Sequence, residues 1–366
     1  MRIIQVVNVR WFNATAWYAL FLSRLLRDAG HEVIVLTLEG TETHEKALAW
    51  GLDARALPLN TVNPIRLVSL LFSLRKLVKT FQPDVVNCHR GESFILWGLL
   101  KKCGKGFKLF RTRGDQRLPR NNFPNRWLHS SCADGVISTN SVMHRHFLSN
   151  FGIPNPQLHL IPGGVDRDKF QFSPAGRAEL REQYGYADSD FVVGLLGRFD
   201  EVKGQKELIA SIATLRAQGL TQIKLLLLGF ETATSEQSVR TWIAENDMQD
   251  ATTITGFCPD IAAAISCCDL GVIASKWSET IARAALEFMS CHVPIVSSSV
   301  GVMPDLLPAE ALFAPGDVQD MGTHITRAYT DAAYYARLGH IQGERINHLT
   351  GADFLQQTLN VYRGLA

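Results

Sequence analysis

The chain has 366 residues, of which 46% are hydrophobic and 20% charged, and a formal net charge of +2. This is an ordinary globular composition, and the length favours two domains over one. No apolar run approaches the roughly 18 residues that a bilayer-spanning helix requires. The N-terminus, MRIIQVVNVRWF, predicts a strand and not a signal peptide, because its apolar part is short and no small-residue cleavage site follows. We therefore expect a cytoplasmic protein.

Charge is distributed unevenly along the chain. Residues 1–165 hold 21 Lys and Arg against 10 Asp and Glu, whereas the remainder holds 16 against 25. The first half therefore carries +11 and the second −9, which predicts an anionic partner for the first half, either a membrane surface or an acidic acceptor. The seven cysteines form no CxxC pair and no zinc-type cluster, so we expect reduced thiols and no metal site.

Strand-like and helix-like segments alternate through the first half. Strands are predicted at residues 3–9, 32–38, 54–57, 84–89, 108–112, 135–139 and 159–161. Helices are predicted at residues 16–29, 65–80, 93–102, 126–133 and 141–151. The alternation predicts an α/β domain over residues 1–165, with a parallel sheet covered on both faces as in Rossmann-like folds. No G-x-G-x-x-G follows the first strand, which argues against a nicotinamide dehydrogenase.

A linker is predicted at residues 166–190, because Pro162-Gly163-Gly164 interrupts the pattern and a polar segment follows. A second alternating domain is expected over residues 191–350. Its clearest strand is KLLLLG at 224–229. Residues 351–366 are expected to contain a terminal helix.

The stretch SKWSETIARAALEFMSCHVPIV, residues 275–296, follows a buried strand and carries two carboxylates, Glu279 and Glu287. If the stretch is helical, these carboxylates lie roughly 12 Å apart along its axis. A carboxylate pairs well with a vicinal diol, and the free N–H groups at a helix start attract phosphate. A nucleotide-sugar offers both groups. Taken singly, the two residues could instead be a helix-start acid and a solvent-facing glutamate.

A second motif, GRFDEVKG at residues 197–204, lies between a predicted strand and a predicted helix. It brings Arg198 and Lys203 into one loop, beside glycines that permit close approach of a ligand to the backbone. Two cations and the free amides of a helix start form a reasonable diphosphate site.

Together these motifs resemble those of the retaining glycosyltransferases of the GT-B fold, family 4. Glu279 and Glu287 match the E-x7-E signature, and residues 197–204 match the GRxxxxKG element. Where the family follows its first Glu with Gly-Phe-Gly, this chain has Thr280-Ile281-Ala282-Arg283, so that the Gly-rich turn is lost and a cation is gained. The resemblance implies two Rossmann-like domains with an interdomain cleft, and a C-terminal helix, here within residues 351–366, that crosses back to the first domain.

The resemblance also implies an activity and its residues. It implies transfer of a sugar from a nucleotide-sugar with retention of configuration and without a metal or other cofactor, and we take a UDP-sugar as the expected donor. Glu279 would contact the donor sugar as a catalytic residue, Glu287 the ribose, and Arg198 and Lys203 the diphosphate. Further donor contacts are expected at Gly197, Thr280 and Ile281.

Two groups in the first half are candidates for the rest of the site. His89 ends a predicted strand, where ligands of open α/β sheets bind, and the resemblance makes it a candidate catalytic residue. A structural strand-end histidine is the alternative. The loop after the next strand is either a solvated basic loop or the binding site of an anionic acceptor. Its candidate acceptor-binding residues are Arg111, Arg113, Asp115 and Arg117, with Arg120 nearby.

The helix at residues 66–79 and the lysines at 101, 102, 105 and 108 predict loose binding to an anionic membrane, expected at the cytoplasmic face of an inner membrane. An ordinary core-facing helix with extended lysines is the alternative. The expected function is therefore sugar transfer to a glycan or lipid-linked acceptor in lipopolysaccharide or cell-surface polysaccharide biosynthesis, with no nucleic-acid partner. Two alternatives stay open: a nucleotide-sugar epimerase of the same fold, and a nucleotide-sugar binding protein without catalysis.

Overall fold

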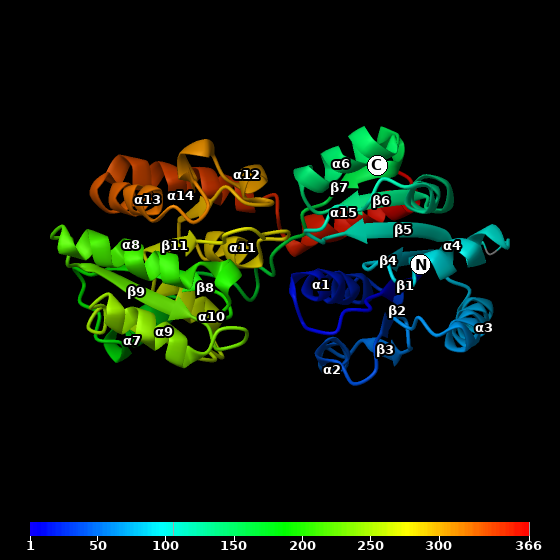
Figure 1. Ribbon diagram of the computed structural model, residues 1–366, viewed down its shortest axis with the longest axis horizontal. Coiled ribbons are helices and arrows are strands. Elements are labelled where there is room, and N and C mark those ends of the chain that lie inside the picture. Colours follow the sequence, from blue (N-terminus) through cyan, green and yellow to red (C-terminus); the bar gives the residue numbers. More distant parts are fainter. Residues whose placement is uncertain (105, 366) are drawn as a thin grey trace. The chain divides into compact units, whose positions relative to one another are not determined.

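The structure is a computed structural model that describes residues 1–104 and 106–365. The chain forms two compact units. Unit 1 comprises residues 1–163 and the C-terminal segment from Gly351, and unit 2 comprises residues 164–350. Each unit is a parallel sheet with helices on both faces (Figure 1). The predicted pair of Rossmann-like domains is confirmed. Neighbouring parallel strands need crossover connections, and these connections cover both faces of each sheet with helices.

The sheet of unit 1 has the strand order β3-β2-β1-β4-β5-β6-β7. Its strands are β1 (Arg2–Val6), β2 (Glu32–Thr37), β3 (Asp53–Ala56), β4 (Val85–Cys88), β5 (Lys108–Arg113), β6 (Gly135–Ser138) and β7 (Leu158–Leu160). Its helices are α1 (Ala14–Asp28), α2 (Glu42–Ala49), α3 (Pro64–Phe81), α4 (Phe94–Lys102), α5 (Phe123–Arg126), the π-helical η1 (Trp127–Cys132), α6 (Ser141–Phe151), the 3₁₀ turn η2 (Asn155–Gln157) and α15 (Gly351–Arg363). All predicted strands are present. Helix α2 was not predicted, because only Thr43 and Ala47 of its residues are buried and no apolar period results.

The sheet of unit 2 has the strand order β10-β9-β8-β11-β12-β13. Its strands are β8 (Phe191–Leu196), β9 (Ile223–Leu228), β10 (Thr252–Ile254), β11 (Leu270–Ile273), β12 (Ile295–Ser298) and β13 (Leu312–Phe313). Its helices are α7 (Pro174–Gln183), η3 (Glu201–Lys203), α8 (Gln205–Ala217), α9 (Glu236–Glu245), α10 (Ile261–Ser266), α11 (Arg283–Ser290), α12 (Met303–Leu306), η4 (Ala309–Ala311), α13 (Val318–Thr330) and α14 (Ala332–Ile346). Helix α13 packs against α8, and α11 against α14.

The strand order reverses between β1 and β4 in unit 1 and between β8 and β11 in unit 2. In open α/β sheets, ligands bind beyond the carboxyl ends of the strands at such a reversal. Each unit therefore has one place where its topology favours a ligand.

The C-terminal helix α15 packs against α1 and is part of unit 1. The hydroxyl oxygen of Tyr362 accepts hydrogen bonds from Nε2 of Gln5 at 3.2 Å and from Nδ2 of Asn87 at 2.8 Å. The ring of Phe354 packs on that of Tyr18 with 4.5 Å between centroids. Because these groups are buried and satisfy one another, the last turn of α15 is fixed to β1 and β4.

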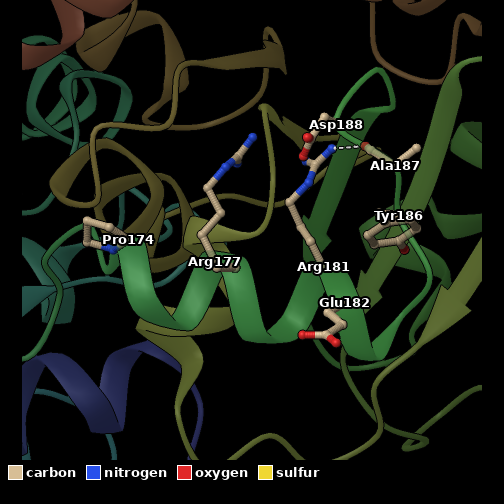
Figure 2. A pocket seen from close by; sticks show the side chains of 8 residues that line it. Pro174, Arg177, Arg181, Glu182, Tyr186, Ala187 and Asp188 are labelled. Atoms are coloured by element: carbon tan, nitrogen blue, oxygen red, sulfur yellow. Dashed lines mark hydrogen bonds between the residues drawn. The ribbon is translucent and has the colours of Figure 1, made fainter.

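The expected linker at residues 166–190 contains helix α7, which is packed into unit 2 against α10. Arg177 donates to the carbonyl oxygens that end α10 and pairs with Asp269 at 2.6 Å, and Arg181 pairs with the same carboxylate at 3.2 Å. A cavity of about 560 Å³ lies beside α7, and Figure 2 shows Arg181 bonded to Ala187 at its wall. The segment is therefore no free linker. Its polar sequence was misleading because its arginines bind backbone carbonyls inside the unit.

Candidate functional site

In unit 2 the loops that follow β8 and β11 meet where the strand order reverses. Lys203, from the loop after β8, forms an ion pair with Glu279, from the loop after β11. Gly204, at φ +73°, lies so close to Ala274 that a Cβ atom would overlap the Ala274 carbonyl oxygen. The two predicted motifs are thus brought together at the position where the topology of this unit favours a ligand.

Hydrogen bonds hold Glu279 in one orientation. Its Oε1 accepts a hydrogen bond from Oγ of Ser275 at 2.7 Å, and Oγ of Ser298 donates to the carbonyl oxygen of Ser275 at 2.6 Å. The backbone N–H of Val302 donates to the Glu279 carbonyl oxygen at 2.8 Å. The residue is only 7% exposed. Because both its backbone carbonyl and one carboxylate oxygen accept hydrogen bonds, Glu279 is preorganised to accept further hydrogen bonds from a polar ligand.

The expectation of a helix from residue 275 is wrong. Helix α11 begins at Arg283, and Glu279 lies in the irregular loop before it, so the spacing of 12 Å derived from helical rise does not apply. The reason is Ala282, which has φ +50° and cannot continue an α-helix. Ile281 is 1% exposed and Thr280 is half-buried. An interaction of Ile281 with a donor therefore has to use its backbone.

The loop after β8 is closed by its own contacts. Arg198, which is exposed, pairs with Asp200 at 2.8 Å, and Asp200 also accepts the N–H of Val202 at the start of η3. Nε2 of Gln205 donates to the carbonyl oxygen of Arg198 at 2.9 Å. Gly197 is packed on the backbone of Gly229. The loop is therefore shaped before any ligand arrives, with the Arg198 guanidinium at its surface.

Glu287 lies on the buried side of α11 and is 2% exposed. Nε of Arg283, one helical turn earlier, donates to its Oε1 at 2.6 Å. Burial raises the pKa of Glu287 above its ordinary value, and the cations of Arg283 and Lys169 oppose that rise. The carboxylate thus depends on neighbouring cations for its charge.

In unit 1 a cluster of charges lies at the carboxyl ends of β4 and β5. Asp115 is 3.4 Å from Nε of Arg113, 3.5 Å from Nη2 of Arg111 and 3.7 Å from Nη1 of Arg90. Glu92 pairs with Arg90 at 2.6 Å. Three guanidinium groups face two carboxylates, so the cluster carries a net charge of +1, close to where the strand order of unit 1 reverses.

The arginines predicted to act together occupy different environments. Arg111 is completely buried, and its Nη1 donates to the carbonyl oxygens of Cys88, at 2.8 Å, and Thr112. Burial lowers the pKa of Arg111 to about 9. Arg113 is 9% exposed and bonds the carbonyl oxygen of Arg117, whose side chain is exposed like that of Arg120. Arg111 is therefore the buried part of the cluster, and its guanidinium is not accessible to an acceptor.

His89 does not lie at an accessible strand end. It is completely buried, its Nε2 is 2.8 Å from Oε1 of Gln5, and its ring packs edge-on against Tyr18. Burial lowers its pKa to about 3, with a further lowering from Arg111. Through Gln5 the ring joins the buried polar network that holds α15.

Sequence reasoning did not single out the groups that orient the site. Ser298 and Asn8 were not proposed as site residues, and Arg283 was noted only as a cation gained after Glu279. Asn8 follows β1 at the reversal of strand order and donates to Glu92 at 3.2 Å, and its position after a buried strand was a usable signal. Within the described residues, no group of three or more His, Cys, Asp or Glu could hold a metal ion. In the same residues, no helix has the length and hydropathy to cross a membrane.

Two family models match the chain. The model described as glycosyl transferases group 1 matches residues 176–343, and the model described as glycosyltransferase family 4 matches residues 15–169. The chain is 27% identical over 235 residues to the D-inositol 3-phosphate glycosyltransferase of Pseudarthrobacter chlorophenolicus, which is 60% of this chain and 55% of that protein. It is 27% identical over 252 residues to the mannosylfructose-phosphate synthase of Agrobacterium fabrum, 65% of this chain and 54% of that protein. The chain thus matches about half the length of these curated relatives.

Solved structures share the fold over the whole chain. The crystal structure of Anabaena HepE in complex with UDP has a TM-score of 0.85 at 19% identity, and covers 100% of both chains. A glycosyltransferase from Rickettsia africae has a TM-score of 0.86 at 16% identity, covering 100% of this chain and 98% of that one. With the two family models that together match residues 15–169 and 176–343, and with the two Rossmann-like units, this chain belongs to the group 1 glycosyltransferases, family 4, and has their GT-B fold.

Proposed function

We propose that the protein is a retaining glycosyltransferase that moves a sugar from a nucleotide-sugar to an anionic glycan or lipid-linked acceptor. The observation that carries this proposal is the meeting of Lys203, Glu279 and Ser275 where the strand order of unit 2 reverses. A cation for a phosphate and an oriented carboxylate for hydroxyl groups suit the two chemical parts of a nucleotide-sugar. We take a UDP-sugar as the first donor to test, because the related fold of HepE has been solved in complex with UDP-glucose.

In this proposal each half of the donor has its own residues. Arg198 and Lys203 bind the diphosphate and neutralise the charge that develops on it as the bond to the sugar breaks. Glu279 accepts hydrogen bonds from the sugar, and Glu287 from the ribose diol. Gly197, Thr280 and Ile281 approach the donor through their backbones. His89, being buried in the α15 network, has a structural role in place of the catalytic one expected for it.

The acceptor is proposed to bind at the charged cluster of unit 1. Nε of Arg113, which is 3.4 Å from Asp115, and Oδ1 of Asn8 are buried and make no hydrogen bond within the part of the chain that the structure describes. Buried polar groups are rarely left unpaired in folded proteins. The net charge of +1 favours an anionic acceptor, such as the phosphorylated glycans of lipopolysaccharide or other cell-surface polysaccharides. Arg113 and Arg117 are the residues proposed to meet it.

Thermal unfolding tests the donor site. We expect one of UDP-, GDP- and ADP-sugars to raise the melting temperature of the wild type, since a ligand at one hundred times its Kd stabilises the native state by about 2.7 kcal/mol. Glu287→Ala should lose this shift. Glu236→Ala, which removes an exposed glutamate of α9 in the same unit, is the control and should keep it. A wild type that responds to none of these nucleotides would contradict the proposed donor class.

Helix α3 gives the proposed membrane contact a defined surface. One side of the helix, with Leu70, Leu74 and Val78, is buried in the core. The opposite side is apolar but exposed, and the residue two positions before the helix continues it: Val62 is exposed by 90%, Ile65 by 81%, Val68 by 55% and Phe72 by 65%. We call these last four residues the α3 outer face. Exposed cations, which anionic lipid attracts, accompany it at Arg66, Arg75, Lys76 and Lys79.

Two of the lysines expected to add to this surface have partners within unit 1, whereas Lys102 is exposed. Lys101 pairs with Asp134, and Nζ of Lys108 donates to the carbonyl oxygen of Tyr362 at 3.0 Å. Lys105 lies outside the described residues. The proposed membrane contact therefore rests on the α3 outer face and its own cations.

Vesicle flotation tests the α3 outer face. We expect the wild type to float with phosphatidylglycerol-containing vesicles and not with pure phosphatidylcholine. The double variant Ile65→Ser/Phe72→Ser should bind at least about 10-fold more weakly, because each buried apolar side chain contributes about 1.5–3 kcal/mol. Val142→Ser/Leu148→Ser, which changes two half-exposed residues of α6 in the same unit, should bind like the wild type. Equal loss in both double variants would contradict a specific role for α3.

A further inference from the structure

Three cations of the proposed donor site are each paired with a carboxylate of the same unit. Arg198 pairs with Asp200, Lys203 with Glu279 and Arg283 with Glu287. The proposed function gives Arg198 and Lys203 to the diphosphate and Glu287 to the ribose. It leaves Arg283 without a role, although Arg283 occupies the carboxylate on which ribose binding is proposed to depend.

The two side chains of the Arg283–Glu287 pair differ in how far they are exposed to solvent. The Glu287 side chain is 3% exposed, whereas that of Arg283 is 38% exposed. Glu287 lies between Leu286 and Phe288, which are both buried. The carboxylate is therefore enclosed in the unit, and the guanidinium is the part of the pair that a ligand can reach from solvent.

A ribose diol would bind the same Glu287 carboxylate that Arg283 contacts. Two neighbouring hydroxyl groups can donate to the two oxygens of one carboxylate. Nε of Arg283 is 2.6 Å from Oε1 of Glu287, and with Arg283 in place the Glu287 side chain is only 3% exposed. Simple removal of Arg283 would leave the buried charge with only the weaker influence of Lys169, which is costly. The cation has to be given another anion at the moment when the diol takes its place.

The donor carries such an anion. Arg283 is the first residue of α11, and the loop that precedes it contains Glu279, which contacts the proposed diphosphate ligand Lys203. We propose that Arg283 exchanges partners when the donor binds: it leaves Glu287 for the diphosphate, and Glu287 then accepts both ribose hydroxyls. Arg283 is thus a positioning residue that couples recognition of the diphosphate to recognition of the ribose. This inference rests on the proposed donor site.

Calorimetric titration with UDP and with uridine tests the exchange. In the wild type UDP should bind more tightly than uridine. Arg283→Gln should weaken UDP binding by about 10-fold or more, since a hydrogen bond to a charged group is lost, and should change uridine binding by less than about 2-fold. Arg283→Lys keeps the charge and should recover most of the UDP affinity. Arg240→Gln removes the arginine of a similarly spaced but exposed pair with Glu236 on α9, and should bind both ligands like the wild type.

The outcomes separate this inference from the proposed function. If Arg283→Gln weakens UDP and uridine by the same factor, Arg283 acts only through Glu287 and the exchange is refuted. An unchanged UDP affinity in Arg283→Gln refutes it as well. If Arg283→Gln does not fold, an Arg283→Lys variant that folds but shows no preference for UDP over uridine also refutes the exchange. A wild type that binds neither this pair, nor GDP and guanosine, nor ADP and adenosine refutes the donor site itself, and the exchange with it.

Discussion

Replacement of Glu279 by glutamine is expected to lower kcat by about 100-fold or more, because a preorganised charged group at the reacting sugar is lost while its shape is kept. The change removes the counter-ion of Lys203 and the charged acceptor of the Ser275 hydrogen bond. UDP affinity should stay within about 3-fold of the wild type, since Glu279 is not itself a proposed contact of the diphosphate or the ribose, although Lys203 loses its partner. The measurement is release of UDP from the UDP-sugar, together with UDP titration.

Glu201→Gln is the matched control for this variant. Glu201 belongs to the loop after β8, its side chain is 73% exposed, and it pairs with Lys276 instead of Lys203. It should retain full activity. If Glu279→Gln lost UDP affinity in proportion to its activity, Glu279 would be a support of the diphosphate loop and its assignment to the sugar would be wrong.

Gly301→Ala is expected to destabilise unit 2 by about 3 kcal/mol and to abolish donor binding. Gly301 has φ +62°, and a Cβ atom there would overlap the backbone carbonyl oxygen of Glu279. Relief of that overlap requires the Glu279 loop to move and breaks the hydrogen bond from Val302 to Glu279. Stability and ligand binding should therefore fall together, as thermal unfolding with and without nucleotide would measure.

Gly316→Ala separates the two causes of this loss. Gly316 has φ +76° in the same unit, but no atom lies within 4 Å of the position of a Cβ. Only the left-handed backbone then opposes the substitution, at about 1 kcal/mol, and nucleotide binding should persist. Equal effects of the two substitutions would mean that contact with Glu279 does not matter.

Much of the fold follows from local sequence. Alternating apolar and amphipathic runs predicted the strands of unit 1. Most of these strands are buried on both faces and are therefore short continuous apolar runs, whereas β3 is only partly buried. Helices with few buried residues were not predicted. Helix α2 buries only Thr43 and Ala47, and α7 buries only Arg181. Their positions are fixed by contacts with distant backbone, such as that of Arg181 with the carbonyl oxygen of Cys267, which no local pattern reveals.

For the site, the sequence by itself determined the residue types: a cation motif at 197–204 and two glutamates eight positions apart. Only the tertiary structure decided how they are used. Lys203 and Glu279 are 76 positions apart and meet because β8 and β11 are neighbours in the sheet. The left-handed Ala282 delays α11 to Arg283, which lets that arginine cover Glu287. His89 and Arg111, which were expected to contact ligands, are completely buried. These environments depend on which side chains the packed chain covers. Burial shifts the pKa of a titratable side chain and decides whether a ligand can contact it, and neither effect can be read from the residue type alone.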